Sequence, residues 1–254
     1  MTAGRSPERT GQSMSGLLNG VVIRVTLRAT MNRKRALLFA VPPLILIGIS
    51  ALLHATANSP VWPPEVLGQV GYLILALTAL LIGGSVLGAE IDDGSIVHLL
   101  ATPVSRTSVI LSKFAAAVAL TVMFGALPEF VAAGIARGFG GKLALGLLAG
   151  ALVASVAYNA LFVMLSALTT RAIAVGLLYL LVWEGLLGNL VGGVRVLSIG
   201  QYSVSVANSI AKASALNAHL TLPTAIVMGL LVTVATLAVA ARKLSAFSVK
   251  GEAV

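Results

Sequence analysis

The chain has no cysteine and only eight acidic residues among its 254. Without cysteine it can form neither a disulfide nor a thiolate-bound metal site. Charged residues of both signs make up 10% of the sequence, whereas a soluble domain carries about 25%. This shortage of charge, together with 58% hydrophobic residues, excludes an ordinary soluble domain. It indicates an all-α, polytopic membrane protein.

Motifs of hydrolases and nucleotide-binding proteins are also missing. No G-x-S-x-G, H-E-x-x-H or paired-Asp pattern accompanies His54, His98 or His219. The nearest approach to a P-loop is at 138–143. It has Ala136 where the motif has its first glycine, and no Ser or Thr after Lys142. We therefore expect no enzyme, no metal site and no cofactor in this chain. If ATP and Mg²⁺ drive it, another chain must bind them.

Apolar runs of about 20 residues, long enough to cross a bilayer as helices, occur six times. They lie at 36–54, 66–89, 110–133, 143–167, 172–193 and 221–241. These runs predict a six-helix transmembrane domain over 36–241, followed by a C-terminal tail at 242–254. Pro42 and Pro43 lie near the start of the first run, where a helix tolerates them. A signal peptide ending in Ala-Thr-Ala at 55–57 is the alternative for this run, although the polar segment before it is long.

The segment before the first run divides into two parts. Residues 1–14 are polar and rich in Ser, Thr, Gly and Arg, which is typical of disorder. From 15 to 35 the pattern is that of an amphipathic helix, with Val22 and Val25 in its apolar stripe and Arg24 and Arg28 at the flank. We interpret 15–35 as an interfacial helix on the cytoplasmic surface; a merely basic leader is the alternative.

The distribution of Lys and Arg predicts the orientation. With both termini in the cytoplasm, the outer segments hold only Arg137, Lys142, Arg195 and Lys212, and the other 13 of the 17 basic residues lie inside. This bias follows the positive-inside rule. It explains the net charge of +9 better than nucleic-acid binding does. We expect a multi-pass protein of the cell membrane, the bacterial inner membrane in particular.

The connection at 194–220 is too polar to cross the membrane and too apolar for a free loop. Val204, Val206, Ile210 and Leu216 are interspersed with Ser, Asn and Lys. This composition favours a short external or re-entrant helix.

The loop Glu90–Lys113 is too polar for a bilayer and lies between two apolar runs. Asp93-Gly94 and Pro103 bound a short amphipathic helix of about two turns. Its apolar residues are Ile96, Val97, Leu99 and Leu100. A small, partly apolar helix held between two membrane helices is suited to a groove on a soluble partner.

The order of residues in this loop resembles that of ABC-2-type transporter permeases. The pattern is an acid, a Gly-Ser or Gly-Thr pair, two leucines, Pro-x-Ser-Arg and a later lysine. Here it is carried by Glu90, Gly94-Ser95, Leu99-Leu100, Pro103-Val104-Ser105-Arg106 and Lys113. In that family the loop is a coupling helix that docks on an ATPase subunit. The resemblance implies that a cytoplasmic ABC ATPase, which binds ATP and Mg²⁺, is contacted by Glu90, Asp93, Gly94, Ile96, Leu99, Leu100, Pro103 and Arg106.

Polar residues inside the apolar runs are candidates for a transport pathway. Glu129 and Glu184 are the only carboxylates there, and a charge in a membrane helix should face protein or water. Glu129, near Arg137, is either an interfacial acid or part of the pathway. Glu184, with Asn189 beyond it, either lines a pathway or seals a helix contact. Further candidates are Tyr158 and Asn159, for which structural hydrogen bonding is the alternative.

Three GxxxG spacings, Gly84/Gly88, Gly146/Gly150 and Gly188/Gly192, allow close helix packing within one subunit or across a dimer. Six helices with few polar faces make a poor pore alone, so we expect a second permease copy or a sibling permease.

We interpret the chain as a permease subunit that exports an amphipathic or lipid-like compound, with export implied by the resemblance. An ATP-independent secondary transporter or a membrane scaffold is the alternative.

Overall fold

The computed structural model describes residues 20–31, 33–56, 62–92, 106–188 and 192–250, and all the regular elements in these ranges are helices. The all-α prediction is thus confirmed for this part of the chain. In chain order the elements are α1 (Gly20–Thr30), α2 (Arg33–Thr56), α3 (Trp62–Val66), η1 (Leu67–Gly71), α4 (Tyr72–Asp92), α6 (Arg106–Thr121), η2 (Val122–Ala126), α7 (Leu127–Arg137), α8 (Lys142–Leu168), α9 (Ala172–Leu178), η3 (Tyr179–Leu187), η4 (Gly192–Leu197), α11 (Ile199–Ala211), η5 (Ser214–Leu216) and α12 (Leu222–Lys250).

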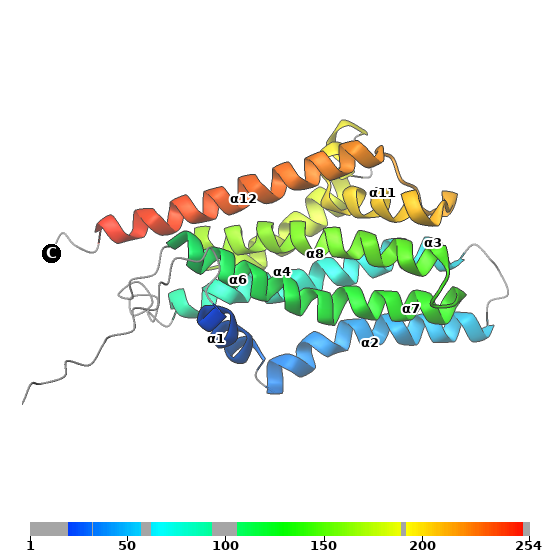
Figure 1. Cartoon of the computed structure of the whole chain (residues 1–254), viewed down its shortest axis with the longest axis horizontal. Helices are drawn as coiled ribbons and strands as arrows, with labels where there is room; N and C mark the ends of the chain where they lie inside the picture. The colour runs from blue at the N-terminus through cyan, green and yellow to red at the C-terminus, as the bar shows by residue number, and fades with distance from the viewer. Residues whose placement is uncertain (1–19, 32, 57–61, 93–105, 189–191, 251–254) are drawn as a thin grey trace, which may run out of the picture.

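The helix α8 lies at the centre of the bundle (Figure 1). It packs against α11, α4 and α12, and also against α7 and α6. Its buried face carries small residues, among them Gly146, Gly150, Ala151 and Ala154. Small side chains let neighbouring helices approach closely, which membrane helices need because lipid gives no hydrophobic drive between them. The helix α8 is therefore the common wall on which the surrounding helices are positioned.

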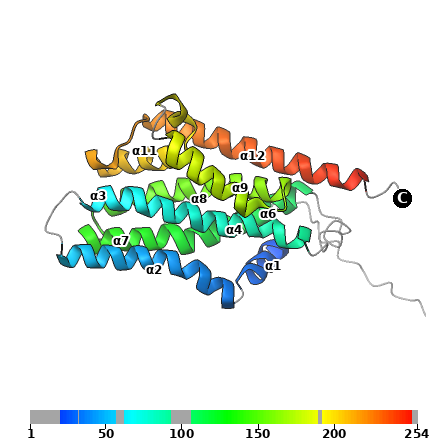
Figure 2. The same cartoon turned by 180° about the vertical axis from the view of Figure 1, so that it is seen from behind.

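The helices α2 and α12 lie on opposite sides of the bundle in both views (Figures 1 and 2). Only 22% of the apolar window in α2 and 28% of that in α12 is buried, against 61% in α8. Their outward faces carry exposed Leu44, Leu230 and Val234. A helix that is apolar on its exposed face is suited to a lipid environment.

Five of the predicted membrane spans correspond to helices that are long and apolar enough to cross a bilayer. Among the described residues these are Ala36–Thr56, Trp62–Val86, Thr107–Arg137, Lys142–Leu168 and Leu222–Leu244. The remaining prediction, 172–193, corresponds to a shorter apolar helix, Ala172–Leu187. The helix α12 continues beyond its apolar segment, which ends at Leu244, as far as Lys250. Most of the predicted tail at 242–254 is therefore helical.

The predicted helix within 194–220 is present as α11, which packs along α8. Ser198 caps its start by accepting a hydrogen bond from the Gln201 backbone N–H at 3.2 Å. In the described ranges, three π-helical segments, η1, η2 and η3, interrupt the α-helical geometry elsewhere. Such segments insert a residue into a helix and are frequent at functional sites.

The predicted helix at 15–35 is α1 over Gly20–Thr30, which packs against α6. In the predicted apolar stripe Val25 is 57% exposed and Val22 is half-buried, and Ile23 and Leu27 on the other side are half-buried too. An interfacial helix directs its apolar stripe to lipid and not to the protein, so the interfacial interpretation stays a prediction.

Several predictions lie outside the described residues. These are the disordered tail at 1–14, Asn189, and, in the predicted coupling helix, Asp93, Gly94, Ile96, Leu99, Leu100 and Pro103. Of the loop's other residues, Glu90 belongs to the end of α4 and Arg106 to the start of α6.

Candidate functional site

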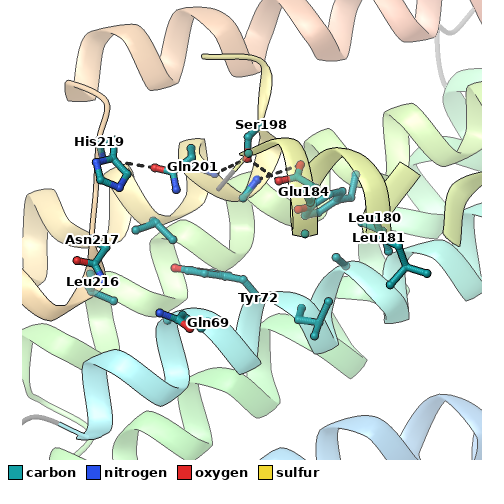
Figure 3. Close-up of a pocket in the computed structure, with 18 residues that line it drawn as sticks. Gln69, Tyr72, Leu180, Leu181, Glu184, Ser198, Gln201, Leu216, Asn217 and His219 are labelled. Atoms are coloured by element: carbon teal, nitrogen blue, oxygen red, sulfur yellow. Dashed lines mark hydrogen bonds between the residues drawn. The ribbon is translucent and has the colours of Figure 1, made fainter. Parts of the chain in front are cut away.

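A cavity of about 530 Å³ opens between η1 and α4 on one side and η3 and α11 on the other (Figure 3). Tyr158 of α8 contributes to its lining, and the segment 216–219 lies at its edge. Asn217 has a positive φ of 50°, a conformation that asparagine tolerates better than most residues, and this turns the chain beside the cavity. Pockets of this size are typical of small-ligand sites.

Glu184 is the centre of a hydrogen-bond cluster in this cavity. Its carboxylate accepts hydrogen bonds from the backbone N–H groups of Ile199 at 2.8 Å and Gly200 at 3.4 Å. It also accepts from the hydroxyls of Ser198 and, at 3.1 Å, Tyr179. Ile199 and Gly200 are the first residues of α11, where backbone N–H groups lack helical partners. A carboxylate there satisfies those donors and offsets the positive end of the helix dipole.

Two tyrosines form part of the cavity wall. The Tyr158 ring stacks on Phe162, with centroids 5.9 Å apart, and its hydroxyl interacts with Glu184. The Tyr72 hydroxyl donates to the Leu147 carbonyl at 3.4 Å. Both rings are buried. These contacts leave the tyrosine hydroxyls engaged with the protein rather than directed to a ligand.

Two carboxamides extend from opposite walls of the cavity, Gln69 from η1 and Gln201 from α11 (Figure 3). The Gln201 side-chain oxygen accepts a hydrogen bond from the His219 backbone N–H at 3.3 Å, and Gln69 is exposed. Sequence reasoning missed both residues. The signal for Gln69 was available, since it is an uncharged polar residue inside an apolar run. Nothing local distinguished Gln201, because its connection contains many other polar residues, among them several Ser and Asn.

The structure brings together two of the predicted pathway residues, Glu184 and Tyr158, but not the other two that it describes. The Asn159 amide donates to Thr121 Oγ1 at 2.8 Å and to the Ser155 carbonyl at 2.7 Å, so it joins α6 to α8. Asn159 is fully buried and does not line the cavity. The structural role that we left open for it matches these contacts.

Glu129 occupies a different place. Its side chain is fully buried, and its two carboxyl oxygens have no hydrogen-bond partner among the described residues. A Cβ placed on Gly71 would lie 3.0 Å from Oε1, so the carboxyl group packs against η1. A solvated interfacial acid or an acid paired with Arg137 does not fit this environment. Glu129 does not line the cavity either.

Gly146/Gly150 and Gly84 pack helices within this chain, whereas Gly188 meets only the nearby Trp183 carbonyl and Gly192 meets nothing within 4 Å. A Cβ on Gly146 would lie 2.6 Å from the Ala207 carbonyl, and a Cβ on Gly150 would overlap the Ser203 carbonyl and the Tyr72 hydroxyl. The pair Gly146/Gly150 thus lets α11 approach the backbone of α8. Gly84 approaches Ile173 in the same way, with a Cβ placed there at 3.2 Å. Among the described residues, no group of three or more His, Asp and Glu side chains could hold a metal ion.

Comparison with known proteins identifies a family whose pattern covers most of the chain. The profile of a family described as ABC-2 family transporter protein matches residues 10–248, which is most of the sequence. A search of curated proteins finds no match.

Proposed function

Since the chain belongs to the ABC-2 transporter family and is thus a permease subunit of an ABC transporter, we propose that it exports an amphipathic or lipid-like compound. The match over residues 10–248 is the observation that carries this proposal. It favours an ATP-driven permease over a secondary transporter or a scaffold. The energy comes from a separate cytoplasmic ABC ATPase, since this chain has no recognisable P-loop.

The ATPase docks on the loop between α4 and α6. The proposed contact residues are Glu90, Asp93, Gly94, Ile96, Leu99, Leu100, Pro103 and Arg106. The end of α4 and the start of α6 lie at the same end of the bundle as α1 and the end of α12 (Figure 1). This shared position supports the proposal. Movement of the docked loop would pass into α4 and α6, and α4 contributes to the cavity.

The cytoplasm lies at that end of the bundle, with α1 at the membrane interface and both termini inside. The helix α1 and the end of α12 lie at the same end of the bundle, which supports an even number of crossings. The excess of Lys and Arg in the segments at that end supports the cytoplasm as its side. Five long apolar helices alone would be odd. We propose that α9 and η3, with seven and nine residues, cover part of the sixth crossing and that α11 covers the rest.

The cavity beside Glu184 lies on the route of the exported compound, and a second permease copy or a sibling permease completes that route. The cavity's lining combines exposed apolar residues, Leu73 and Leu181, with carboxamides, which suits an amphipathic compound. The inner membrane of a bacterium is the proposed location.

The test is reconstitution of the permease with an ABC ATPase encoded in the same genome, in proteoliposomes loaded with a fluorescent amphipath. We expect ATP-dependent movement of the probe that a Walker B variant of the ATPase abolishes. Probe movement of equal rate without ATP would support the secondary transporter instead.

A further inference from the structure

The cavity beside Glu184 has an unusual balance of charge for a site that contains a carboxylate. Among the described residues that line it, Glu184 carries the one acidic group, neither Lys nor Arg is present, and the exposed His219 is the one imidazole. A phosphate or carboxylate ligand would therefore face an acid with no permanently charged cation to balance it. Burial of such a group without a partner is strongly unfavourable.

A cationic ligand is also disfavoured, because the Glu184 carboxylate already accepts hydrogen bonds from the protein. Ile199 and Gly200 donate backbone N–H groups to it, and Ser198 and Tyr179 donate hydroxyls. A ligand ammonium would have to compete with these donors for the two carboxylate oxygens, and displacing Ile199 or Gly200 would remove the cap at the start of α11. The carboxylate thus belongs to the α11 attachment and not to a cation site.

Apart from His219, the groups open to a ligand are uncharged. The Gln69 carboxamide is exposed, and the Gln201 carboxamide keeps its NH₂ group because its oxygen is the atom bonded to His219. A carboxamide both donates and accepts hydrogen bonds, so two of them on opposite walls match a head group of hydroxyls or amides. The side chains of Leu73 and Leu181, which are 52% and 62% exposed, offer apolar surface beside them.

We propose that this cavity binds amphipathic molecules with an uncharged, hydrogen-bonding head group, such as a sugar or an amide. Gln69 and Gln201 hold the head group, and the leucines hold the start of the apolar chain. The inference deepens the proposed export function and rests on it for the direction of transport only. It narrows the amphipathic or lipid-like compounds of the proposed function to those with an uncharged head group.

The experiment uses the purified full chain in nanodiscs, without the ATPase. In a Trp62→Phe background, fluorescence reports on Trp183, whose indole N–H donates to the Leu197 carbonyl at 3.4 Å, one residue from the cavity-lining Ser198. Three probes share a dodecyl chain and are used below their micelle concentrations: dodecyl glucoside, dodecyltrimethylammonium and dodecyl phosphate. We expect dodecyl glucoside to bind about tenfold more tightly than either charged probe, because only the charged head groups lack a partner.

Substitutions locate the binding. Gln69→Leu and Gln201→Leu should each weaken dodecyl glucoside binding by about three- to tenfold, the effect of a lost hydrogen bond. Gln69→Glu should shift the preference to dodecyltrimethylammonium, a gain that a misfolded variant could not show. Ser209→Glu adds the same charge at an exposed position of α11 outside the lining and is the matched control.

Equal affinity for all three probes, or unchanged glucoside binding in both leucine variants, would overturn the proposal and leave a crevice for apolar chains only. The proposed export function fails separately. If the binding results hold and the proteoliposomes show no ATP-dependent movement, the cavity stands and export is wrong. If movement is ATP-dependent and the protein binds all three probes equally, the export function stands and the proposed head-group preference is wrong.

Discussion

The Lys113 side-chain ammonium in α6 donates a hydrogen bond of 3.0 Å to the Val86 backbone carbonyl in α4. Lys113 is only 1% exposed, which is rare for a lysine. The bond joins the two helices that flank the proposed docking loop, about one to two helical turns from each end of it. Lys113, the lysine of the family pattern, thus joins the two helices that carry the ends of the loop and can fix the distance between those ends.

Lys113→Met keeps the apolar stem and removes the donor. We expect the free energy of unfolding to fall by about 1.5–3 kcal/mol, the contribution of a hydrogen bond to a charged group. Lys142→Met is the matched control, since Lys142 is exposed, and should change stability by less than about 0.5 kcal/mol. Thermal unfolding of both variants in one detergent provides the comparison. Equal midpoints for the two variants would show that the bond contributes nothing.

Glu184→Gln separates two roles for this residue. Glutamine has one carbonyl oxygen, and its NH₂ group would face the donors of Ser198, Ile199 or Gly200, so a donor at the start of α11 loses its acceptor. We expect a loss of about 1–3 kcal/mol in the attachment of α11. Hydrogen exchange at the amides of 199–204 should accelerate, while Glu65→Gln, at an exposed site, leaves it unchanged. Lost transport with unchanged exchange would instead indicate a carboxylate of the pathway.

Gly150→Ala tests the close approach of α8 and α11. The added Cβ would overlap the Ser203 backbone carbonyl as well as the Tyr72 hydroxyl, and the backbone atom has little freedom to move away. Overpacking of this kind costs about 1–3 kcal/mol. Gly48→Ala is the control, since a Cβ there meets nothing within 4 Å and should stabilise α2 by about 0.5–1 kcal/mol. Opposite shifts of the unfolding midpoint are expected; a neutral Gly150→Ala would mean that α11 is not tightly packed.

Glu129→Gln should be tolerated. The two carboxyl oxygens are buried without a partner among the described residues, so removing the acid while keeping its shape breaks no hydrogen bond that the structure shows. We expect a change in unfolding free energy within about 1 kcal/mol, whereas Glu129→Ala leaves a void and costs about 2 kcal/mol or more. Thermal unfolding distinguishes them. A larger loss for Gln than for Ala would show that the charge itself is needed.

The length of the membrane helices could be read from the sequence, but the neighbours of their polar residues could not. Apolar runs fix where helices such as α8 begin and end, because about 20 residues cross a bilayer. Which way Glu129 faces depends on η2, whose π-helical geometry inserts one residue just before it and turns the helix face. Glu184 was recognised as a carboxylate inside an apolar run, but its partners at 198–200 become neighbours only when α11 folds back onto α8.

Docking of the ATPase should depend on the apolar face of the loop between α4 and α6. Leu99 and Leu100 are the proposed centre of that face, with Glu90, Asp92 and Arg106 around it. Burying a Leu side chain contributes about 1.5–3 kcal/mol, whereas a charge at an exposed boundary contributes about 0–1 kcal/mol. Leu99→Asp or Leu100→Asp would also force a carboxylate into an apolar groove without a partner. Either substitution should therefore weaken docking far more than Asp92→Asn.

The measurement is copurification of the ATPase with each permease variant, followed by the ATPase activity of the complexes that survive. Because the loop lies outside the predicted spans, all the variants should insert normally, and their yield in membranes checks this. Arg106→Ala should have an intermediate effect if its guanidinium pairs with an acid of the partner, since a bidentate pair is stronger than a single rim charge. If both Leu→Asp variants copurify and hydrolyse ATP like the parent, the loop is not the docking element. The motion that drives α4 and α6 would then have to enter through another cytoplasmic surface, with α1 the nearest candidate because it packs on α6.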